Sequence, residues 1–115
     1  MELKGKERII QEFVPGKQIT LAHIIANPDE SLYQKMGLVD GKGALGIFTI
    51  TPSEGAIIAA DVAAKSAEVQ VGFVDRFNGS LVITGDVAAI HSAAEGIMDI
   101  LCAKMGFTPT SITKT

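Results

Sequence analysis

The residue types best suited to chemistry lie together in one short stretch, Asp75-Arg76-Phe77-Asn78-Gly79. An arginine and an asparagine two positions apart can hold a phosphate by charge and hydrogen bonding, as an acyl-phosphate hydrolase requires. Such a site also needs a loop at a helix start, whose backbone N–H groups surround the anion. The Asn78-Gly79 pair instead predicts a tight hairpin turn. We therefore expect no catalytic role for this stretch, and a solvated strand end is the simplest interpretation of Asp75 and Arg76.

The other residues with chemical potential, His23, His91 and Cys102, are isolated in the sequence. We find no cysteine, histidine or carboxylate beside either histidine at the spacing of a metal site, so packing or surface roles are expected. Cys102 is the only cysteine, and its place beside Leu101 in a predicted helix indicates a small core residue rather than a reactive thiol. The G-K-G of residues 41–43 is too short for a phosphate-binding loop. The sequence therefore predicts no enzyme, no metal site and no cofactor.

The composition indicates one domain built from small apolar residues. The chain has 115 residues and is 47% hydrophobic but only 5% aromatic, so alanine and valine must supply much of the core. Because such a core gives moderate apolar area per residue, burial against other copies of the chain is an attractive source of stability. A net charge of −3 without a basic cluster argues against nucleic acid as a partner. The lone cysteine and the charged residues 1–8 indicate the cytosol, and no apolar run is long enough to cross a membrane.

Several stretches show the two-residue alternation of β-strands. In the clearest one, Val71 and Phe73 are expected on the same face, and Asn78-Gly79 supplies a type I′ turn into a return strand. The nearly continuous apolar run at residues 44–50 indicates a strand that is buried on both faces. The expected strands are residues 17–26, 44–50, 69–76 and 80–84, with a short extended arm at residues 8–14 before Pro15-Gly16.

Three helices are expected from their capping residues. Asn27 caps the predicted start of the first helix and Thr51 that of the second, each followed by a proline at the first helical position. Asp86 is expected to cap the third helix. The expected helices are residues 27–36, 51–67 and 87–105. The expected core residues are Ile57, Ile58 and Val62 in the second helix, and Ile90, Ala94, Ile97, Leu101 and Met105 in the third.

From residue 44 onward, the predicted order is strand, helix, strand, turn, strand, helix, which is a ferredoxin-like βαββαβ unit without its last strand. Two segments are candidates for the closing strand: the tail at residues 107–115 and the strand at residues 17–26. The second is the stronger strand, and the glycine-rich residues 38–43 provide the join that a circularly permuted order requires. We therefore expect an α/β (α+β) fold with a permuted ferredoxin-like unit. The expected organisation is one domain over residues 1–115, with an arm at 1–16 and a core at 17–115.

Four motifs carry a resemblance to a known family. They are I-I-Q-E-F-V-P-G-K-Q-I-T-L-A-H-I-I-A-N-P at residues 9–28, T-I-T-P-S-E at 49–54, V-G-F-V-D-R-F-N-G at 71–79 and T-G-D-V at 84–87. In these motifs the chain resembles the circularly permuted, single-domain shell proteins of bacterial microcompartments (BMC), of the ethanolamine- and propanediol-utilisation type. The resemblance covers nearly the whole chain, and the E-F-V-P-G-K-Q block is its most specific part.

The resemblance implies a structural protein: a hexamer that tiles with other hexamers and other shell proteins into the wall of a microcompartment in the cytoplasm. It implies that six copies of the arm form a parallel β-barrel that caps the axial pore, an arrangement that leaves no strand edge exposed. It also implies a loop near the hexamer axis and a lysine at the hexamer edge. These roles fall on Ile9, Ile10, Gln11, Glu12, Phe13 and Val14 in the barrel, on Asp75, Arg76, Phe77, Asn78 and Gly79 in the axial loop, and on Lys65 at the edge.

Two other functions stay open. A ferredoxin-like regulatory module would bind a small metabolite at a subunit interface and would not form sheets. An adaptor would use the barrel to dock the targeting peptide of a cargo enzyme, which is compatible with the shell role. The assembly also has two possible geometries, because a heterologous contact closes into a flat ring only if its rotation does, and otherwise forms a screw.

Overall fold

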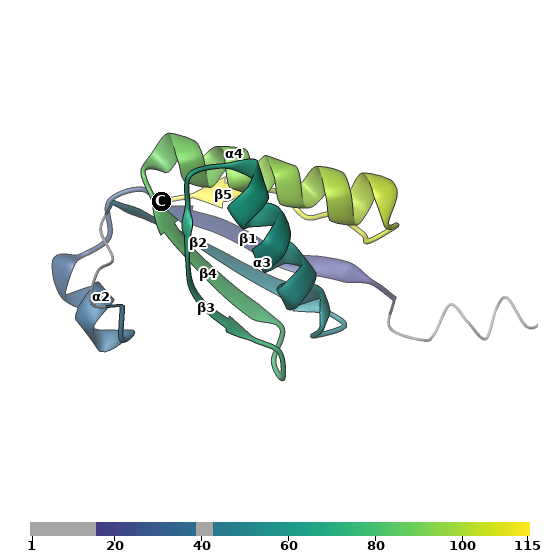
Figure 1. Cartoon of the computed structure of the whole chain (residues 1–115), viewed down its shortest axis with the longest axis horizontal. Helices are drawn as coiled ribbons and strands as arrows, with labels where there is room; N and C mark the ends of the chain where they lie inside the picture. Colours follow the sequence, from purple (N-terminus) through teal and green to yellow (C-terminus); the bar gives the residue numbers. More distant parts are fainter. Residues whose placement is uncertain (1–15, 39–42) are drawn as a thin grey trace, which may run out of the picture.

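The computed structural model describes residues 16–38 and 43–115 (Figure 1). The predicted barrel residues 9–14 and most of the predicted join at 38–43 lie outside the described residues. Two long helices, α3 and α4, lie together on one face of a twisted sheet, and a short helix, α2, lies at one end of the molecule (Figure 1). The elements in chain order are β1 (Gln18–Ile25), α2 (Glu30–Lys35), β2 (Ala44–Thr51), α3 (Gly55–Ser66), β3 (Gln70–Asp75), β4 (Ser80–Gly85), α4 (Val87–Ile97), its π-helical continuation η1 (Met98–Lys104) and β5 (Thr113–Lys114).

The strands form one mixed sheet in the order β3-β4-β2-β1-β5. β1 pairs antiparallel with β2, β2 with β4, and β4 with β3. β1, which covers most of the predicted strand at residues 17–26, therefore lies beside β2 inside the sheet. The carboxyl-terminal tail, which was the weaker candidate, adds a short parallel strand outside β1. Thr108, earlier in the tail, also bridges to the start of β1.

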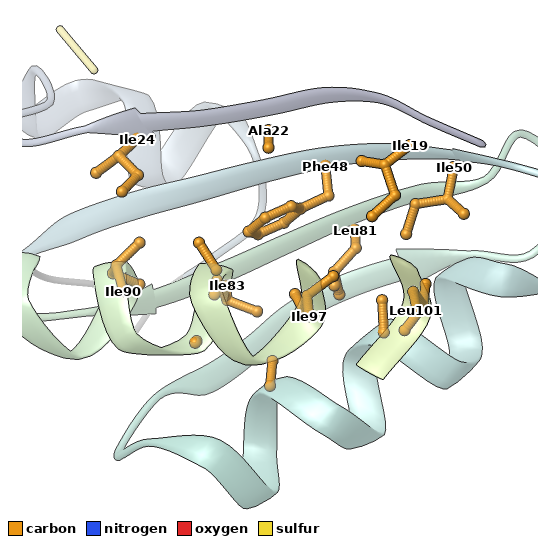
Figure 2. Close-up of a cluster of buried hydrophobic side chains, with 14 of the residues drawn as sticks. Ile19, Ala22, Ile24, Phe48, Ile50, Leu81, Ile83, Ile90, Ile97 and Leu101 are labelled. Carbon is orange, nitrogen blue, oxygen red and sulfur yellow. The ribbon is translucent and has the colours of Figure 1, made fainter. Parts of the chain in front are cut away.

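The main hydrophobic core lies between the sheet and the helices α3 and α4 (Figure 2). Phe48 on β2 points toward α4, and Ile90 and Ile97 on α4 point back toward the sheet. Each fully buried side chain of this size contributes about 1.5–3 kcal/mol relative to an exposed one. The predicted core positions Ile90, Ala94, Ile97 and Leu101 are all buried, and Met105 packs partly against them. The prediction for the last long helix is thus confirmed, although its final turns are π-helical.

A smaller apolar cluster lies under α2 on the opposite face of the sheet. Tyr33 packs there against Leu45 and Val82. α2 has only six residues, so it leaves other apolar side chains of this face partly in contact with solvent. Leu21 and Phe73 are examples. Among the described residues, no helix is long and apolar enough to span a membrane.

Two β-bulges change which side chains share a face. In β1 the pairing register shifts between Ile19 and Leu21, so Ile19 is buried in the core whereas Leu21 is 41% exposed. In β3 the register shifts between Val71 and Phe73, across Gly72, and these two residues pair with consecutive residues of β4. The prediction that Val71 and Phe73 lie on the same face is therefore wrong. One extra residue in a bulge reverses the alternation beyond it.

The first helix begins later than predicted. Asp29, rather than Asn27, is the cap of α2: its Oδ1 accepts hydrogen bonds from the backbone N–H of Ser31 at 2.9 Å and from the Ser31 hydroxyl at 2.8 Å. Both residue types are good caps. The serine two positions on provides two donors to the same Asp29 oxygen, and the helix starts at Glu30.

The second helix also begins later than predicted, whereas the third begins as expected. Thr51 is the last residue of β2, and α3 starts at Gly55 without a side-chain cap. The residues between them form a turn in which the Gly55 N–H donates to the carbonyl of Pro52 at 2.8 Å. Asp86 caps α4 by accepting a hydrogen bond from the Ala89 N–H at 2.8 Å, which confirms that prediction.

Two of the three core positions predicted in α3 are wrong, because Ile57 is 48% exposed and Ile58 37% exposed. The third, Val62, is partly buried and packs against the main core. Small residues lie against the sheet and α4 instead, because only they allow the helix to approach both closely. The buried residues of α3 are Gly55, Ala56, Ala59 and Ala63.

Candidate assembly surface

The loop between β3 and β4 has four residues, not the two of the predicted turn. Asp75 and Ser80 are the last residues that pair, and the Gly79 N–H donates to the Asp75 carbonyl at 2.8 Å. Gly79 has a φ of 76°, a conformation that favours glycine. Its carbonyl accepts a hydrogen bond from the Ile50 N–H at 2.8 Å. The loop is therefore fixed to the end of β2 as well as to β3.

The Asp75 carboxylate organises this loop from within. Its Oδ1 accepts hydrogen bonds from the backbone N–H groups of Phe77 at 2.8 Å and Asn78 at 3.1 Å, and its Oδ2 accepts one from the Asn78 amide at 2.9 Å. The Asn78 backbone N–H contributes most to a lowered pKa of Asp75, followed by that of Phe77 and by the Asn78 amide. Because the Asn78 amide donates to Asp75, it is engaged within the loop rather than presented to a phosphate.

The tip of the loop presents an aromatic ring to solvent. Phe77 is 78% exposed, and the Arg76 guanidinium lies over its ring at 5.0 Å from the centroid. Such a cation–π contact contributes about 0.5–1 kcal/mol at an exposed site. An open groove beside the ring is lined by Ile57 of α3, Val74 of β3 and the loop residues from Asp75 to Phe77. The loop and the start of α3 therefore form one continuous surface.

Large exposed apolar side chains gather on this side of the molecule, around the edge strand β3 and the start of α3. The sequence analysis missed the two isoleucines of α3, which it assigned to the core. The sequence does contain a pattern that predicts the buried face. Ala56, Ala59 and Ala63 recur at the helical spacing of a buried stripe, whereas Ile57 and Ile58 are adjacent in the sequence. The exposed residues on this side are Ile57, Ile58, Val71, Val74 and Phe77, whereas Phe73 of β3 lies on the opposite face of the sheet.

Lys65, the predicted hexamer-edge residue, lies in the last turn of the same helix. Its Nζ is 2.9 Å from Asp61 Oδ2 in an exposed pair one helical turn apart. Eight residues separate Lys65 from Ile57, a rise of about 12 Å along the helix. The structure therefore places the predicted axial loop beside the start of α3 and the predicted edge lysine near its end.

The two histidines have different surroundings. His23 lies within hydrogen-bonding distance of two threonines of the tail: Nδ1 is 2.6 Å from Thr113 Oγ1, and Nε2 is 2.9 Å from Thr115 Oγ1. His91 Nδ1 is 3.5 Å from Glu95 Oε2, one helical turn on. The sequence analysis was wrong to find no carboxylate near His91. Both histidines therefore have polar side chains as neighbours: threonines for His23 and a carboxylate for His91.

Cys102 is half-buried and packs against the main core, as predicted. Burial raises the pKa of its thiol, which lowers its reactivity. Within residues 16–38 and 43–115, no three histidine, cysteine or carboxylate side chains lie close enough to hold a metal ion.

Comparisons with known proteins identify the family. The BMC domain profile matches residues 44–109, more than half of the chain. The bacterial microcompartment shell protein PduU of Salmonella typhimurium is 55% identical over 109 residues, which cover 95% of this chain and 94% of the relative. The bacterial microcompartment shell protein EutS of the same organism is 54% identical over 111 residues, which cover 96% of this chain and 99% of the relative.

Solved structures support the same family assignment. A CutR flat hexamer matches with a TM-score of 0.84 and 47% identity over 94% of this chain and 99% of that one. A CutR screw with a 41.9 Å pitch matches with a TM-score of 0.82 and 44% identity over 88% of this chain and 100% of that one. The chain therefore belongs to the BMC domain family and is a single-domain microcompartment shell protein of the PduU/EutS type, with a structural rather than a catalytic role.

Proposed function

We propose that this chain forms a flat homohexamer that tiles, with further copies and other shell proteins, into the wall of a bacterial microcompartment. The observation that carries the proposal is the match to CutR as a flat hexamer, at a TM-score of 0.84 over nearly the whole chain. The mechanism is geometric, because flat tiles joined edge to edge exclude bulk diffusion. Such a wall would confine volatile or reactive intermediates, such as aldehydes, in the cytoplasm.

Size-exclusion chromatography with light scattering tests the hexamer. A particle of six times 12.1 kDa is expected at micromolar protomer concentrations. A stable monomer or dimer would contradict the proposal. Particles that lengthen with concentration would instead indicate a screw, since a heterologous contact whose rotation does not close forms an open helix.

We infer that the chain order is a circular permutation of the ferredoxin-like unit. β1 comes first in the chain, yet it lies beside β2 in the place of a closing strand. In this order, residues 9–14 precede the first core strand. We propose that six copies of them form the parallel barrel over the axis, above the axial loop from Asp75 to Gly79.

Removal of residues 1–14 tests the axial cap. Density maps of the intact assembly should show a closed axis, and those of the shortened chain an open one. An unobstructed axis in the intact assembly would refute the cap. The same pair of proteins tests the adaptor function: a cargo enzyme's targeting peptide should bind only the intact chain.

We propose that Lys65 contributes to contacts between hexamers. Its long stem can pack across an interface while its ammonium reaches an acceptor on the neighbour. The variant Lys65→Ala should leave the hexamer intact, because an exposed ion pair such as Lys65–Asp61 contributes only about 0–1 kcal/mol. Electron microscopy should show that the variant no longer forms sheets or tubes. Lys104→Ala, at the end of η1, is the control; equal sheet formation by both variants would contradict the role.

A further inference from the structure

The carboxyl-terminal tail runs along the outer edge of β1 and is attached to it at two places. The first place is the start of β1, directly after the buried ring of Phe107. The Thr108 N–H donates to the carbonyl of Lys17 at 2.8 Å, and the Ile19 N–H donates to the carbonyl of Thr108 at 2.9 Å. The Lys17 ammonium also donates to the carbonyl of Met105 at 2.6 Å. The tail is therefore held firmly up to Thr108.

The second place is the end of β1, where the attachment is short and open to water. β5 pairs in parallel with this part of β1, but it has only two residues, and both are exposed. The Thr115 N–H donates to the carbonyl of Ile24 at 2.9 Å, and the Ala26 N–H donates to the carbonyl of Thr115 at 2.8 Å. Residues 109–112, between the two places, lie in no strand or helix. Ile112 is only partly buried where it packs against the main core.

The side chain of His23 joins this end of the tail to β1. Its Nδ1 lies 2.6 Å from Thr113 Oγ1, and its Nε2 lies 2.9 Å from Thr115 Oγ1. Residues two positions apart share a face of a strand, so one ring reaches both hydroxyl groups. A neutral imidazole has one donor and one acceptor nitrogen, and a hydroxyl can take either role, so both contacts are satisfied at once. His23 thus adds two hydrogen bonds to an attachment that has few others.

The end of the tail has the features of a segment that opens locally. Few buried apolar contacts and exposed backbone hydrogen bonds allow a segment to open while the rest of the domain stays folded. One net hydrogen bond changes such an opening equilibrium by about 2- to 12-fold. The strands β2 and β4, in contrast, lie inside the sheet and carry most of their side chains buried.

We propose that residues 109–115 form a strap that opens and closes over the edge of β1 independently of the rest of the fold, and that His23 is the residue that holds the strap closed. The strap turns after Thr108, the last residue of the firm attachment. When it opens, the second half of β1 becomes the edge of the sheet. The inference does not depend on the proposed function, because it concerns contacts within one copy of the chain.

Amide hydrogen exchange of the full-length protein measures the opening. The Ala26 and Thr115 amides report on the strap, and the amides of β2 and β4 report on the core. In His23→Ala the two strap amides should exchange at least about fivefold faster than in the wild-type chain, because two hydrogen bonds are lost. The core amides should keep their wild-type rates. His91→Ala is the matched control: its ring faces Glu95 on its own helix, and the variant should leave the strap amides unchanged.

Substitution of the two hydroxyl groups tests the same contacts without a change in β1. Thr113→Val and Thr115→Val together keep the β-branched side chains that suit a strand and remove both partners of the imidazole. This double variant should also speed strap exchange by at least about fivefold. Adding His23→Ala to it should change the rate by less than about twofold, because residues that act through one contact are not additive.

Each part of the proposal has its own contrary result. Strap amides that exchange at the wild-type rate in His23→Ala would refute the role of His23. Effects of the histidine and threonine variants that multiply would also refute it, since His23 would then act through other contacts. Core amides that speed up together with the strap amides would refute the independent opening, because the tail would then unfold only with the whole domain.

Discussion

Gly79 and Gly37 form a matched pair for measuring how tightly the loop between β3 and β4 is fixed to the sheet. Their φ angles are 76° and 77°, so alanine is strained to the same degree at both positions. A Cβ at Gly79 would collide with the carbonyl oxygen of Ile50 and lie 3.2 Å from the Cα of Ser53, whereas a Cβ at Gly37 would meet nothing within 4 Å. Gly37→Ala therefore reports the cost of the backbone conformation alone.

The expected magnitudes follow from these surroundings. Gly37→Ala should lower the free energy of unfolding by about 1–2 kcal/mol, the cost of a left-handed conformation for a residue with a Cβ. Gly79→Ala carries the same cost. It also forces the backbone of the loop away from β2, which adds about 1–3 kcal/mol by analogy with other overpacked sites. The total for Gly79→Ala is thus about 2–5 kcal/mol.

Urea unfolding, followed by far-ultraviolet circular dichroism, measures both variants against the wild-type chain. All three proteins must be compared at one protomer concentration, because assembly raises the apparent stability. Gly37→Asn provides a further control, since asparagine tolerates the left-handed conformation better than alanine does. It should recover part of the lost stability.

If Gly79→Ala and Gly37→Ala lose the same free energy of unfolding to within about 0.5 kcal/mol, the precision with which independent sites can be compared, the reasoning is refuted. Such a result would mean that the loop moves away from Ile50 at no cost. The hydrogen bond between the Ile50 N–H and the Gly79 carbonyl would then not fix the loop.

Three further predictions concern single side chains. Asp86→Ala should lower the free energy of unfolding by about 1 kcal/mol by removing the cap of α4, and Asp86→Asn should restore most of it. Phe48→Ala should lower it by about 3–5 kcal/mol, because this fully buried ring leaves a cavity between the sheet and α4. The pKa of Asp75 in the folded chain lies below its ordinary value of 3.8, so the stability that its loop hydrogen bonds provide is complete above pH 3.8 and is lost as the pH falls through the folded value. In NMR titrations the Phe77 amide should shift below pH 3.8 in the wild-type chain, and Asp75→Asn should abolish that shift; a transition at or above pH 3.8 would contradict the assignment.

The order of the sheet was predictable because it depends on long patterns rather than single residues. The strand at residues 17–26 has two apolar faces, which suits a position inside the sheet, and the structure places β1 between β2 and β5. The core face of α4 was predictable for the same reason. Its large apolar residues recur at helical spacing over most of its length, and Asp86 supplies a cap with no competitor beside it.

The local details were less predictable because neighbouring groups compete for the same hydrogen bonds. Asn27 and Asp29 are both suitable caps. In the structure Asp29 is the cap, and the backbone N–H and the hydroxyl of Ser31 both donate to its carboxylate. Asn78-Gly79 alone favours a two-residue turn. The Asp75 carboxylate instead binds two backbone N–H groups of the loop, which suits a longer connection. A bulge such as the one at Gly72 depends on the partner strand, so alternation within one strand does not reveal it.

The error at α3 has a different cause. Prediction from hydrophobicity assumes that the largest apolar side chains of a helix face the core of its own chain. That assumption fails where a helix must approach a sheet and another helix closely, because only small side chains fit there. In α3 the alanines hold the helix against its own fold, which leaves Ile57 and Ile58 outside. Side-chain size is therefore a poor guide to the buried face of a helix that packs this closely.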